Sequence, residues 1–343
     1  MRPHFMRPHF SLLLTFCLGL FLAAQASAQA SAQTACAGRD LIATLPAAQR
    51  AALDAAVAAA PYPSGNHWRA VRGDSTLDII GTYHLFDPRM PDHLERLAPA
   101  ILAADSIYLE ATEVETAALK SAISTRPELI ITQGATLPER LSAAEWQQVA
   151  AEMTARGIPA FLASKFQPWY VSVLLSMPPC AMASMAQGSS GLDHLILEIA
   201  NTHGIPTLPL EPFDTIFRIF DGISPDDQID MIRAALPLSQ NAEDMMATMA
   251  ASYFRGDHRQ IWEYSRLKGI EAAGERRDKA IADFALMEDM LINSRNRNWT
   301  EVILGAAPGR TLVIAVGAGH LGGEAGLLRL LEQAGYTLTE AEF

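Results

Sequence analysis

Two apolar runs that end at a glycine, one near each end of the chain, are followed by a histidine at the same spacing. Residues 77–84 read Leu-Asp-Ile-Ile-Gly-Thr-Tyr-His, and residues 312–320 read Leu-Val-Ile-Ala-Val-Gly-Ala-Gly-His. Short apolar runs bounded by turn residues are typical of buried strands, and open α/β sheets bind ligands beyond the carboxyl ends of their strands. The repeated pattern predicts that His84 and His320 lie at one edge of one sheet.

The neighbouring segments alternate between strand and helix patterns. Residues 67–71 and 76–80 flank an Arg-Gly-Asp turn and predict a β-hairpin. An amphipathic helix is predicted over 91–104, and a strand over 106–110 follows it. The order strand, helix, strand is typical of parallel strands. The chain is therefore expected to be an α/β protein with a mixed, mostly parallel sheet flanked by helices.

Three further stretches add detail to this picture. Leucine and isoleucine at helical spacing predict a helix over 39–60. The prolines in 205–211 place that predicted strand at an edge of the sheet. Residues 224–292 have helical patterns throughout and contain several methionines. We interpret 224–292 as an inserted helical lid that covers the site, and ordinary core packing of the methionines is the alternative.

The first residues have the three-part layout of a secretory signal peptide. Arg2 and Arg7 precede an apolar run over 11–24, and small residues follow that run. We expect residues 1–29 to be a signal peptide and residues 30–343 to form a single domain. No later run reaches the ~18 apolar residues of a membrane helix, so no stable membrane span is expected.

The charge balance is acidic. The chain has 38 Asp and Glu against 26 Lys and Arg, a formal net charge of −12 at pH 7. Loss of Arg2 and Arg7 with the signal peptide would move this charge from −12 to −14. Nucleic acid is therefore not an expected partner. An exported protein of this kind is expected in the periplasm or outside the cell.

Cys36 and Cys180 are the two cysteines outside the predicted signal peptide. Two cysteines in an exported protein predict one disulfide, because oxidising compartments allow such bonds to persist. This bond would attach the N-terminal arm to the turn over 177–180. Two unpaired buried thiols are the alternative.

Carboxylates at strand ends can complete a site with the two histidines. Glu110 closes an Ile-Tyr-Leu run, and Glu211 closes a Leu-Pro-Leu run. A charge that ends an apolar strand costs free energy unless it is paired or bound to a metal. Two imidazoles with one or two carboxylates suit a divalent Mn, Zn or Co ion, and such an ion would lower the pKa of a bound water to give a hydrolytic nucleophile. For Glu110, a salt bridge to a helix is the alternative.

Two other polar residues are candidates for supporting roles. Arg295 balances charge at the site or holds a developing oxyanion, unless it forms an ion pair on a helix surface. Asp87 orients an imidazole or caps the turn after His84. The chain contains no His-Glu-x-x-His, no Gly-x-Ser-x-Gly and no phosphate-binding loop. The corresponding zinc-protease, serine-hydrolase and P-loop classes therefore lack support.

Taken together, these motifs resemble the TraB/GumN family over about residues 40–343. The resemblance rests on Gly81-Thr-Tyr-His84, the run from Ala103 to Glu110, Gly191-Leu-Asp193, Leu210-Glu211, Arg295-Asn296 and the run from Val316 to Leu321. The segments around Cys36 and Cys180 resemble the exported proteobacterial branch of that family. The resemblance implies an erythromycin-esterase-like α/β fold with a helical cover. The family's animal relatives, the Tiki proteins, are described as metal-dependent proteases.

Applied residue by residue, the resemblance implies His84, Glu110 and His320 as metal ligands. It also makes Arg295 a likelier polar partner than Arg297, and we predict Glu110 and Arg295 as the catalytic residues. The other site candidates are Glu211, Asn296 and Asp87.

The residues and the resemblance together predict a periplasmic metal-dependent hydrolase, peptidase-like, with Mn, Co or Zn as its ion and a peptide or glycan as its substrate. The alternative is a non-catalytic ligand-binding protein of the cell envelope, linked to polysaccharide or peptide handling, because GumN is associated with a xanthan gene cluster. Cleavage of peptides by the metal-loaded protein would separate the two. The sequence does not determine the oligomeric state.

Overall fold

The computed structural model describes residues 36–343, which belong to one compact unit. The predicted signal peptide, residues 1–29, lies outside the described residues. The strands are β1 (His67–Arg72), β2 (Ser75–Thr82), β3 (Ser106–Leu109), β4 (Thr207–Pro209), β5 (Thr311–Gly317) and β6 (Thr337–Glu340). The α-helices are α1 (Ala47–Ala58), α2 (Met90–Leu102), α3 (Glu113–Thr125), α4 (Leu137–Arg140), α5 (Ala143–Ala155), α6 (Ala160–Ala163), α7 (Pro168–Ser176), α8 (Pro179–Ala186), α9 (Leu192–His203), α10 (Thr215–Asp221), α11 (Pro225–Ser239), α12 (Ala242–Phe254), α13 (His258–Ala272), α14 (Arg277–Glu288), α15 (Ser294–Ala306) and α16 (Leu327–Gln333).

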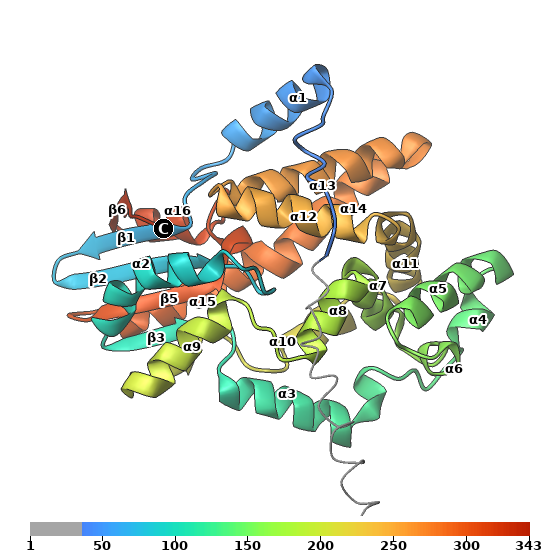
Figure 1. Cartoon of the computed structure of the whole chain (residues 1–343), viewed down its shortest axis with the longest axis horizontal. Helices are drawn as coiled ribbons and strands as arrows, with labels where there is room; N and C mark the ends of the chain where they lie inside the picture. The colour runs from blue at the N-terminus through green and yellow to red at the C-terminus, as the bar shows by residue number, and fades with distance from the viewer. Residues whose placement is uncertain (1–35) are drawn as a thin grey trace, which may run out of the picture. The chain divides into compact units, whose positions relative to one another are not determined.

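The strands form one mixed, mostly parallel sheet with the order β4-β3-β5-β2-β1-β6 (Figure 1). β5 lies in the middle and pairs in parallel with both β2 and β3. The predicted strand–helix–strand unit therefore has parallel strands, but β5, from the far end of the chain, lies between them. β1 and β2 form the predicted antiparallel hairpin. β4 is an edge strand, as its prolines indicate.

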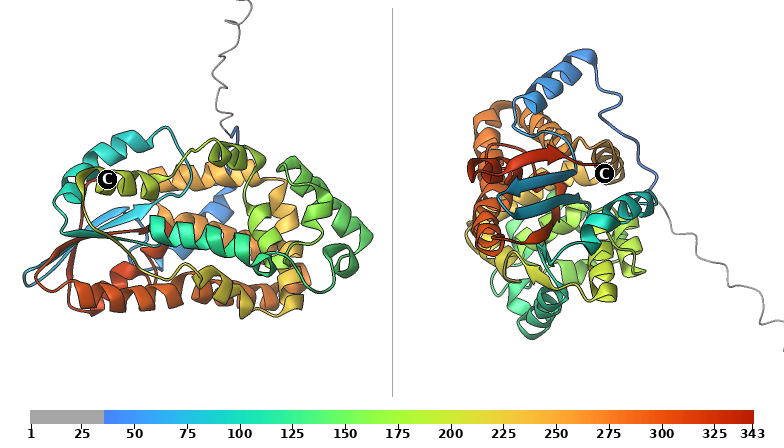
Figure 2. Two further views of the ribbon diagram at one scale, coloured as in Figure 1. Left: turned by 90° about the horizontal axis from the view of Figure 1, so that it is seen from below. Right: turned by 90° about the vertical axis from the view of Figure 1, so that its left-hand side faces the viewer.

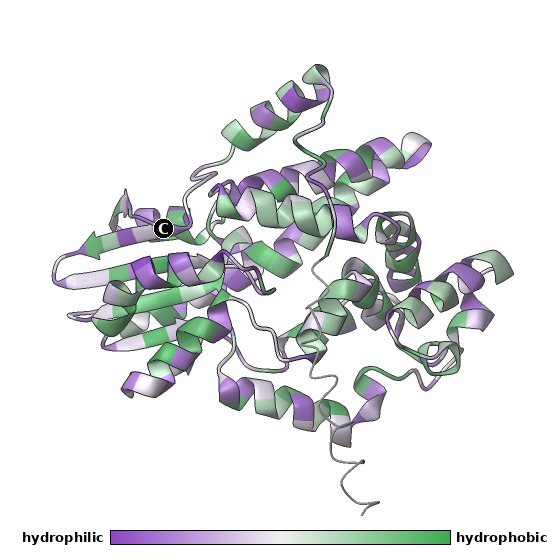
Figure 3. Ribbon diagram, viewed as in Figure 1, coloured by the Kyte–Doolittle hydropathy of each residue, from purple (hydrophilic) through white to green (hydrophobic). Residues whose placement is uncertain are grey.

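Both faces of the central strands β2, β3 and β5 are buried under helices, and the side chains of β5 alternate between the two faces. Leu312, Ile314 and Val316 pack with apolar residues of α15 and α16. Val313 and Ala315 pack with residues of α2, α9 and α12 on the opposite face. Figure 2 shows these helices above and below the sheet, and Figure 3 shows that β5 is largely hydrophobic. This double covering explains why the strand reads as a continuous apolar run in the sequence.

A second core lies among helices away from the sheet. Leu137 of α4, Val149 of α5, Val171 of α7 and Ile232 of α11 belong to it, and α7 packs along α11. These helices form the right-hand part of Figure 1. Between α7 and α11, the chain returns to the sheet through α9 and β4.

The helical stretch 224–292 contributes to several cores. Its α11 packs in the helical core, α12 provides Tyr253 to the sheet core, and α13 provides Tyr264 to a small cluster with Leu53 of α1. The stretch is helical, as its sequence pattern predicts, and α13 continues through Gly269. The function of this stretch as a lid stays a prediction.

The first helix is shorter than predicted. A helix was expected over 39–60, but α1 spans Ala47–Ala58. Pro46 is the reason, because proline disfavours a helical conformation in the residue before it and lacks an N–H for the helix. The preceding residues form an arm on α12, where the Leu41 N–H donates to Thr248 Oγ1 at 2.8 Å. Gly38 lies so close to the backbone of Glu243 that a Cβ would overlap it.

Cys36 and Cys180 form the predicted disulfide, with their Cα atoms 5.4 Å apart. The bond joins the arm to the first turn of α8. It is consistent with an oxidising compartment. Within residues 36–343, no single helix is long and apolar enough to cross a membrane, although α7 and α8, bent by 93° at their junction, together meet the length and composition of a span.

His258, at the start of α13, is a buried histidine away from the candidate site. Its side chain is 3 % exposed, and its Nε2 atom has no hydrogen-bond partner among the described residues. Burial lowers the pKa of His258 to about 4, and the charge of Arg259 adds to this effect, while a hydrogen bond with the backbone of Ser64 opposes it. The unfolded chain has a histidine pKa of about 6.5. Between about pH 4 and pH 6.5, the unfolded chain therefore binds a proton at this histidine that the folded chain does not bind.

We expect this histidine to make the protein less stable in acid. Because the folded pKa is lowered, stability is complete above about pH 6.5 and decreases as the pH falls towards 4, by about 3 kcal/mol for this group. His258→Gln should remove that contribution, which urea denaturation at a series of pH values measures. His194→Gln is the control, because the His194 side chain is 47 % exposed. Identical pH dependence in the wild-type and His258→Gln proteins would contradict the assignment.

Candidate active site

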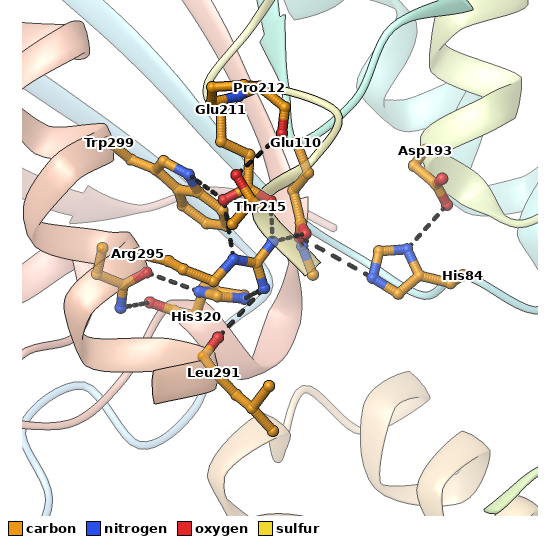
Figure 4. Close-up of polar contacts among 12 residues, drawn as sticks. His84, Glu110, Asp193, Glu211, Pro212, Thr215, Leu291, Arg295, Trp299 and His320 are labelled. Atoms are coloured by element: carbon orange, nitrogen blue, oxygen red, sulfur yellow. Dashed lines mark hydrogen bonds and ion pairs between the residues drawn. The ribbon is translucent and has the colours of Figure 1, made fainter. Parts of the chain in front are cut away.

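The three principal candidate residues lie at one edge of the sheet. His84 follows β2 by two residues, Glu110 follows β3 directly, and His320 follows β5 by three residues. β2, β5 and β3 are parallel neighbours, so their carboxyl ends lie side by side. Figure 4 shows the three side chains converging with Arg295 and Glu211. The sequence pattern therefore predicted the position of this cluster correctly.

Both carboxylate oxygens of Glu110 have partners. Oε1 accepts a hydrogen bond from the Gly317 N–H at 2.6 Å, and Oε2 accepts one from Arg295 Nη2 at 2.7 Å. Gly317 is suited to this position because a Cβ there would lie 3.0 Å from His84 Nε2 and 3.2 Å from Glu110 Oε1. The glycine that ends β5 therefore allows the carboxylate to approach the backbone.

Arg295 lies at the centre of the cluster, and all five of its N–H donors are used. Nε and Nη2 donate to the two oxygens of Glu211 at 2.9 and 2.6 Å. Nη2 also donates to Glu110, and Nη1 donates to the Leu291 carbonyl and towards His320 Nε2, both at 3.2 Å. A guanidinium has five N–H groups. Arg295 therefore has no donor left for a substrate in this arrangement and acts through its charge.

Trp299, one turn after Arg295 in α15, supports this arrangement. The Arg295 guanidinium carbon lies 4.6 Å from the centre of the indole ring, a cation–π contact. The indole N–H donates to Glu211 Oε2 at 3.0 Å. The same indole packs on His320, with ring centres 4.4 Å apart. The tryptophan is fully buried and fixes the arginine, the glutamate and the histidine together.

Asn296 determines the tautomer of His320. Its Nδ2 group donates to the carbonyls of His320 and Ala325 at 3.0 and 2.8 Å, which makes Oδ1 the acceptor side of the amide. Oδ1 lies 2.7 Å from His320 Nδ1, so this ring nitrogen carries the hydrogen. Nε2 of the neutral ring then has a lone pair, which accepts the hydrogen bond from Arg295.

His84 differs from His320 because it faces open space. Its side chain is 58 % exposed. Nδ1 lies 3.3 Å from Asp193 Oδ1 in an ion pair, without the alignment of a good hydrogen bond. Nε2 lies 3.9 Å from Glu110 Oε1. This distance is too long for a direct hydrogen bond, and it suits two groups that contact a third atom between them.

The environments of the three residues shift their pKa values in different directions. Burial lowers the pKa of His320 to about 3, and Arg295 adds to the effect, so His320 is neutral at pH 7. Burial works against ionisation of Glu110, but the two histidines, Arg295 and the Gly317 N–H outweigh it and hold the Glu110 pKa at about 2. Desolvation opposes a charge on His84, but Asp193 and Glu110 raise the His84 pKa to about 9. Solvent screens part of this attraction, because the ring is more than half exposed.

The other predicted candidates have different positions. Glu211 reaches the site and accepts hydrogen bonds from Arg295, although Pro209 lies in the strand before it. Asn296 contacts His320 at Nδ1, the ring nitrogen that does not contact Arg295. Asp87 has no hydrogen bond to an imidazole among the described residues, and the turn-capping alternative is the one present: Oδ1 accepts from the Arg89 N–H at 3.0 Å, and both oxygens accept from the Arg89 side chain at 2.7 Å. The carboxylate beside His84 is that of Asp193, a residue that the sequence indicates only as part of a family motif.

The contact between α9 and His84 depends on Gly191. The Leu192 N–H donates to the Tyr83 carbonyl at 2.9 Å, which brings Asp193 to His84. A Cβ on Gly191 would lie 2.3 Å from the carbonyl carbon of His84 and 2.3 Å from the carbonyl oxygen of Tyr83, both backbone atoms. A side chain at this position therefore requires the backbone to move.

Gly191→Ala is expected to lower the free energy of unfolding by about 1–3 kcal/mol, because overpacking forces backbone shifts. Gly305→Ala in α15 is the matched control. Nothing lies within 4 Å of a Cβ at Gly305, and alanine is favoured over glycine in a helix by about 1 kcal/mol. Urea denaturation of both variants measures the difference. Equal stability of the two variants would show that α9 is not held closely against His84.

The donor set fits the divalent metal implied by the resemblance only in part. His84 Nε2 and Glu110 Oε1 are 3.9 Å apart, and metal bonds of ~2.0–2.2 Å place two ligands of one ion ~3–4 Å apart. Asp193 behind His84 corresponds to the carboxylate that commonly orients a metal-binding histidine. His320 Nε2, in contrast, is engaged by Arg295. Among residues 36–343, no three His, Cys, Asp or Glu side chains form a set of metal ligands.

Comparison of the sequence with models of protein families identifies the family that the sequence motifs resemble. The model of the TraB/PrgY/gumN family matches residues 66–340, a span that contains β1 to β6 and every residue of the cluster described above. No curated protein matches the chain. The match covers most of the chain and its whole sheet. The chain therefore belongs to the TraB/PrgY/gumN family.

Proposed function

We propose that this protein is a hydrolase whose reaction centre lies between His84 and Glu110. The observation that carries the proposal is the 3.9 Å separation of His84 Nε2 from Glu110 Oε1, at the exposed end of an otherwise fully bonded cluster. A separation of this size allows both groups to contact one atom between them, either an attacking water or the metal ion that would supply that water. His84 is the one member of the cluster with more than half of its side chain exposed to an incoming substrate.

Each residue of the cluster has a distinct part in this proposal. The pKa of Glu110 is lowered to about 2, so its carboxylate is ionised at neutral pH and can accept a hydrogen bond from the water. This hydrogen bond directs the lone pairs of the water oxygen away from the carboxylate. Asp193 holds the His84 ring so that Nε2 faces Glu110. Arg295 helps to lower the pKa of Glu110 and holds the carboxylates of Glu110 and Glu211 in place. A preorganised set of charges of this kind lowers the barrier without rearranging during the reaction.

A divalent ion, Mn, Co or Zn, belongs to the proposal, with His84 and Glu110 as the residues that would hold it. Such an ion would supply a bound water of lowered pKa. These two residues fit the ion because the His84 ring is supported by Asp193, and Glu110 Oε1 faces His84. The His84 proton would have to leave before Nε2 binds metal.

The compartment and the substrate class rest on other observations. The Cys36–Cys180 disulfide supports an exported, periplasmic protein and an assignment to the exported proteobacterial branch of the family. The Tiki proteins, animal relatives within the family, are described as proteases, which supports a peptide as the substrate. A peptidase-like activity is therefore the form of the hydrolase that we propose.

A peptide library tests the proposal. We expect the protein, supplied in turn with Mn, Co and Zn, to cleave a subset of peptides, which mass spectrometry detects. His84→Ala and Glu110→Gln should each lose about 100-fold or more of the rate. His194→Ala is the control, because that histidine is exposed on α9 and pairs with Glu198.

Two results would contradict the proposal. Equal cleavage by the wild-type and His84→Ala proteins would place the activity elsewhere. Absence of cleavage with all three metals, together with peptide or glycan binding that His84→Ala abolishes, would favour a non-catalytic binding protein of the cell envelope.

A further inference from the structure

The two histidines of the repeated motif are in opposite states. His84 is exposed and its Nε2 faces a gap, whereas His320 is 5 % exposed and both of its ring nitrogens have partners. The sequence gives them the same spacing from a glycine. The structure gives them different neighbours, because His84 faces α9 while His320 packs against α15.

The lone pair of His320 is directed by a chain of hydrogen bonds that begins in the backbone. The two carbonyls that accept from Asn296 Nδ2 fix the orientation of its amide. The amide oxygen then requires a hydrogen on His320 Nδ1, which leaves Nε2 as an acceptor. Its partner is Arg295 Nη1 at 3.2 Å. An arginine side chain has no acceptor atom, so this contact uses the lone pair that a metal would need.

Freeing that lone pair would require Arg295 to move. The guanidinium is held by Glu110, Glu211, the Leu291 carbonyl and the Trp299 ring. Its withdrawal would leave Glu211 without a cation and Glu110 with only the exposed His84 ring, 3.9 Å away, although each carboxylate is less than 20 % exposed. Unpaired charges in such surroundings are strongly unfavourable. The arrangement therefore favours an arginine that stays in place.

We propose that His320 is a positioning residue for Arg295 and is not a metal ligand, so that the ion of the proposed hydrolase is held by His84 and Glu110 without it. This inference rests on the proposed function for the position of the ion. In this arrangement, His320 holds Nη1 of Arg295, and Arg295 in turn holds Glu110 in the orientation that faces His84. The positive charge that His320 holds in place is that of the Arg295 guanidinium, which belongs to the protein itself and is always present.

The same substitution at the two histidines provides a matched test. Glutamine can accept a hydrogen bond from Arg295 through its side-chain oxygen, but its amide is a poor ligand for zinc compared with imidazole. We expect His84→Gln to weaken zinc binding, measured by calorimetry, by about 100-fold or more. His320→Gln should change the dissociation constant by less than about threefold, in a protein whose circular dichroism matches the wild type. Equal weakening by both substitutions would overturn the inference.

Nitrogen NMR of the histidine rings adds a second measurement. Without metal, His320 should show the neutral Nδ1–H tautomer, and addition of zinc should shift the Nε2 signal of His84 while leaving that of His320 in place. A zinc-induced shift at His320 Nε2, or an Nε2–H tautomer without metal, would overturn the inference.

The two proposals can fail separately. If the wild-type protein binds no Mn, Co or Zn, the metal-dependent hydrolase fails. The inference about His320 is then decided by its tautomer and by the signal of the Arg295 Nη1 hydrogens, the group that donates to His320 Nε2. That signal should persist in His320→Gln and be lost or broadened in His320→Ala if the ring positions Arg295. Persistence of the signal in both variants would contradict a positioning role.

Discussion

Replacement of Arg295 by methionine is expected to lower the free energy of unfolding by about 3–5 kcal/mol. The substitution preserves much of the side-chain volume but leaves Glu110 and Glu211 without the cation that both contact. It also removes the partners of His320 Nε2 and the Leu291 carbonyl. Loss of one member of a desolvated ion pair leaves the other charge uncompensated, which is the costly case. Chemical denaturation measures the change.

Arg297→Met is the matched control, two residues along the same helix. Arg297 is 52 % exposed and pairs with Asp289, which is 51 % exposed. Exposed ion pairs contribute about 0–1 kcal/mol, so the control should remain close to the wild type. A small loss at Arg295, similar to that of the control, would mean that the carboxylates of the cluster do not depend on the guanidinium. Partial recovery in Arg295→Met combined with Glu211→Gln would confirm that the loss is electrostatic.

The second large effect is expected from the disulfide. Replacement of both Cys36 and Cys180 by serine should lower the free energy of unfolding by about 3–5 kcal/mol, because the bond closes a loop of 144 residues and restricts the unfolded chain. The arm that carries Cys36 keeps its hydrogen bonds to α12, so the fold itself should persist. Thermal or urea denaturation with and without reductant measures the effect.

The reductant provides the internal control for this prediction. Reduction should destabilise the wild-type protein to the level of the double-serine variant and should leave that variant unchanged. If complete reduction does not change the stability of the wild-type protein, the disulfide does not constrain the unfolded chain as the length of the closed loop predicts.

The centre of the sheet could be predicted from the sequence because β2, β3 and β5 are buried on both faces. Residues 312–316 are apolar throughout, and each side chain has helices to pack against. Glycine at the end of each run marked the turn, and His84 and His320 followed at equal spacing. Glu110 and Glu211 could be found because a carboxylate that ends an apolar strand needs a partner. Arg295 was a candidate for balancing their charge, and the family motifs then added Asn296.

The roles within the site could not be predicted in the same way. Spacing made His84 and His320 equivalent, but their states depend on α9 and α15, which pack on opposite faces of the sheet. Asp193 has no local signal, because its contact with His84 depends on the close approach of Gly191 to the backbone. Asp87 is nearer in the sequence, but Arg89 engages it. Trp299 reads as an ordinary core residue until its N–H is seen on Glu211.

A crystal of the protein soaked with zinc or manganese, measured at the absorption edge of the metal, would test the central claim directly. The proposed site predicts an anomalous peak ~2.0–2.2 Å from both His84 Nε2 and Glu110 Oε1, with Arg295 still bonded to Glu110, Glu211 and His320. An ion bound to His320 with Arg295 displaced, or an ion elsewhere with none between His84 and Glu110, would contradict it.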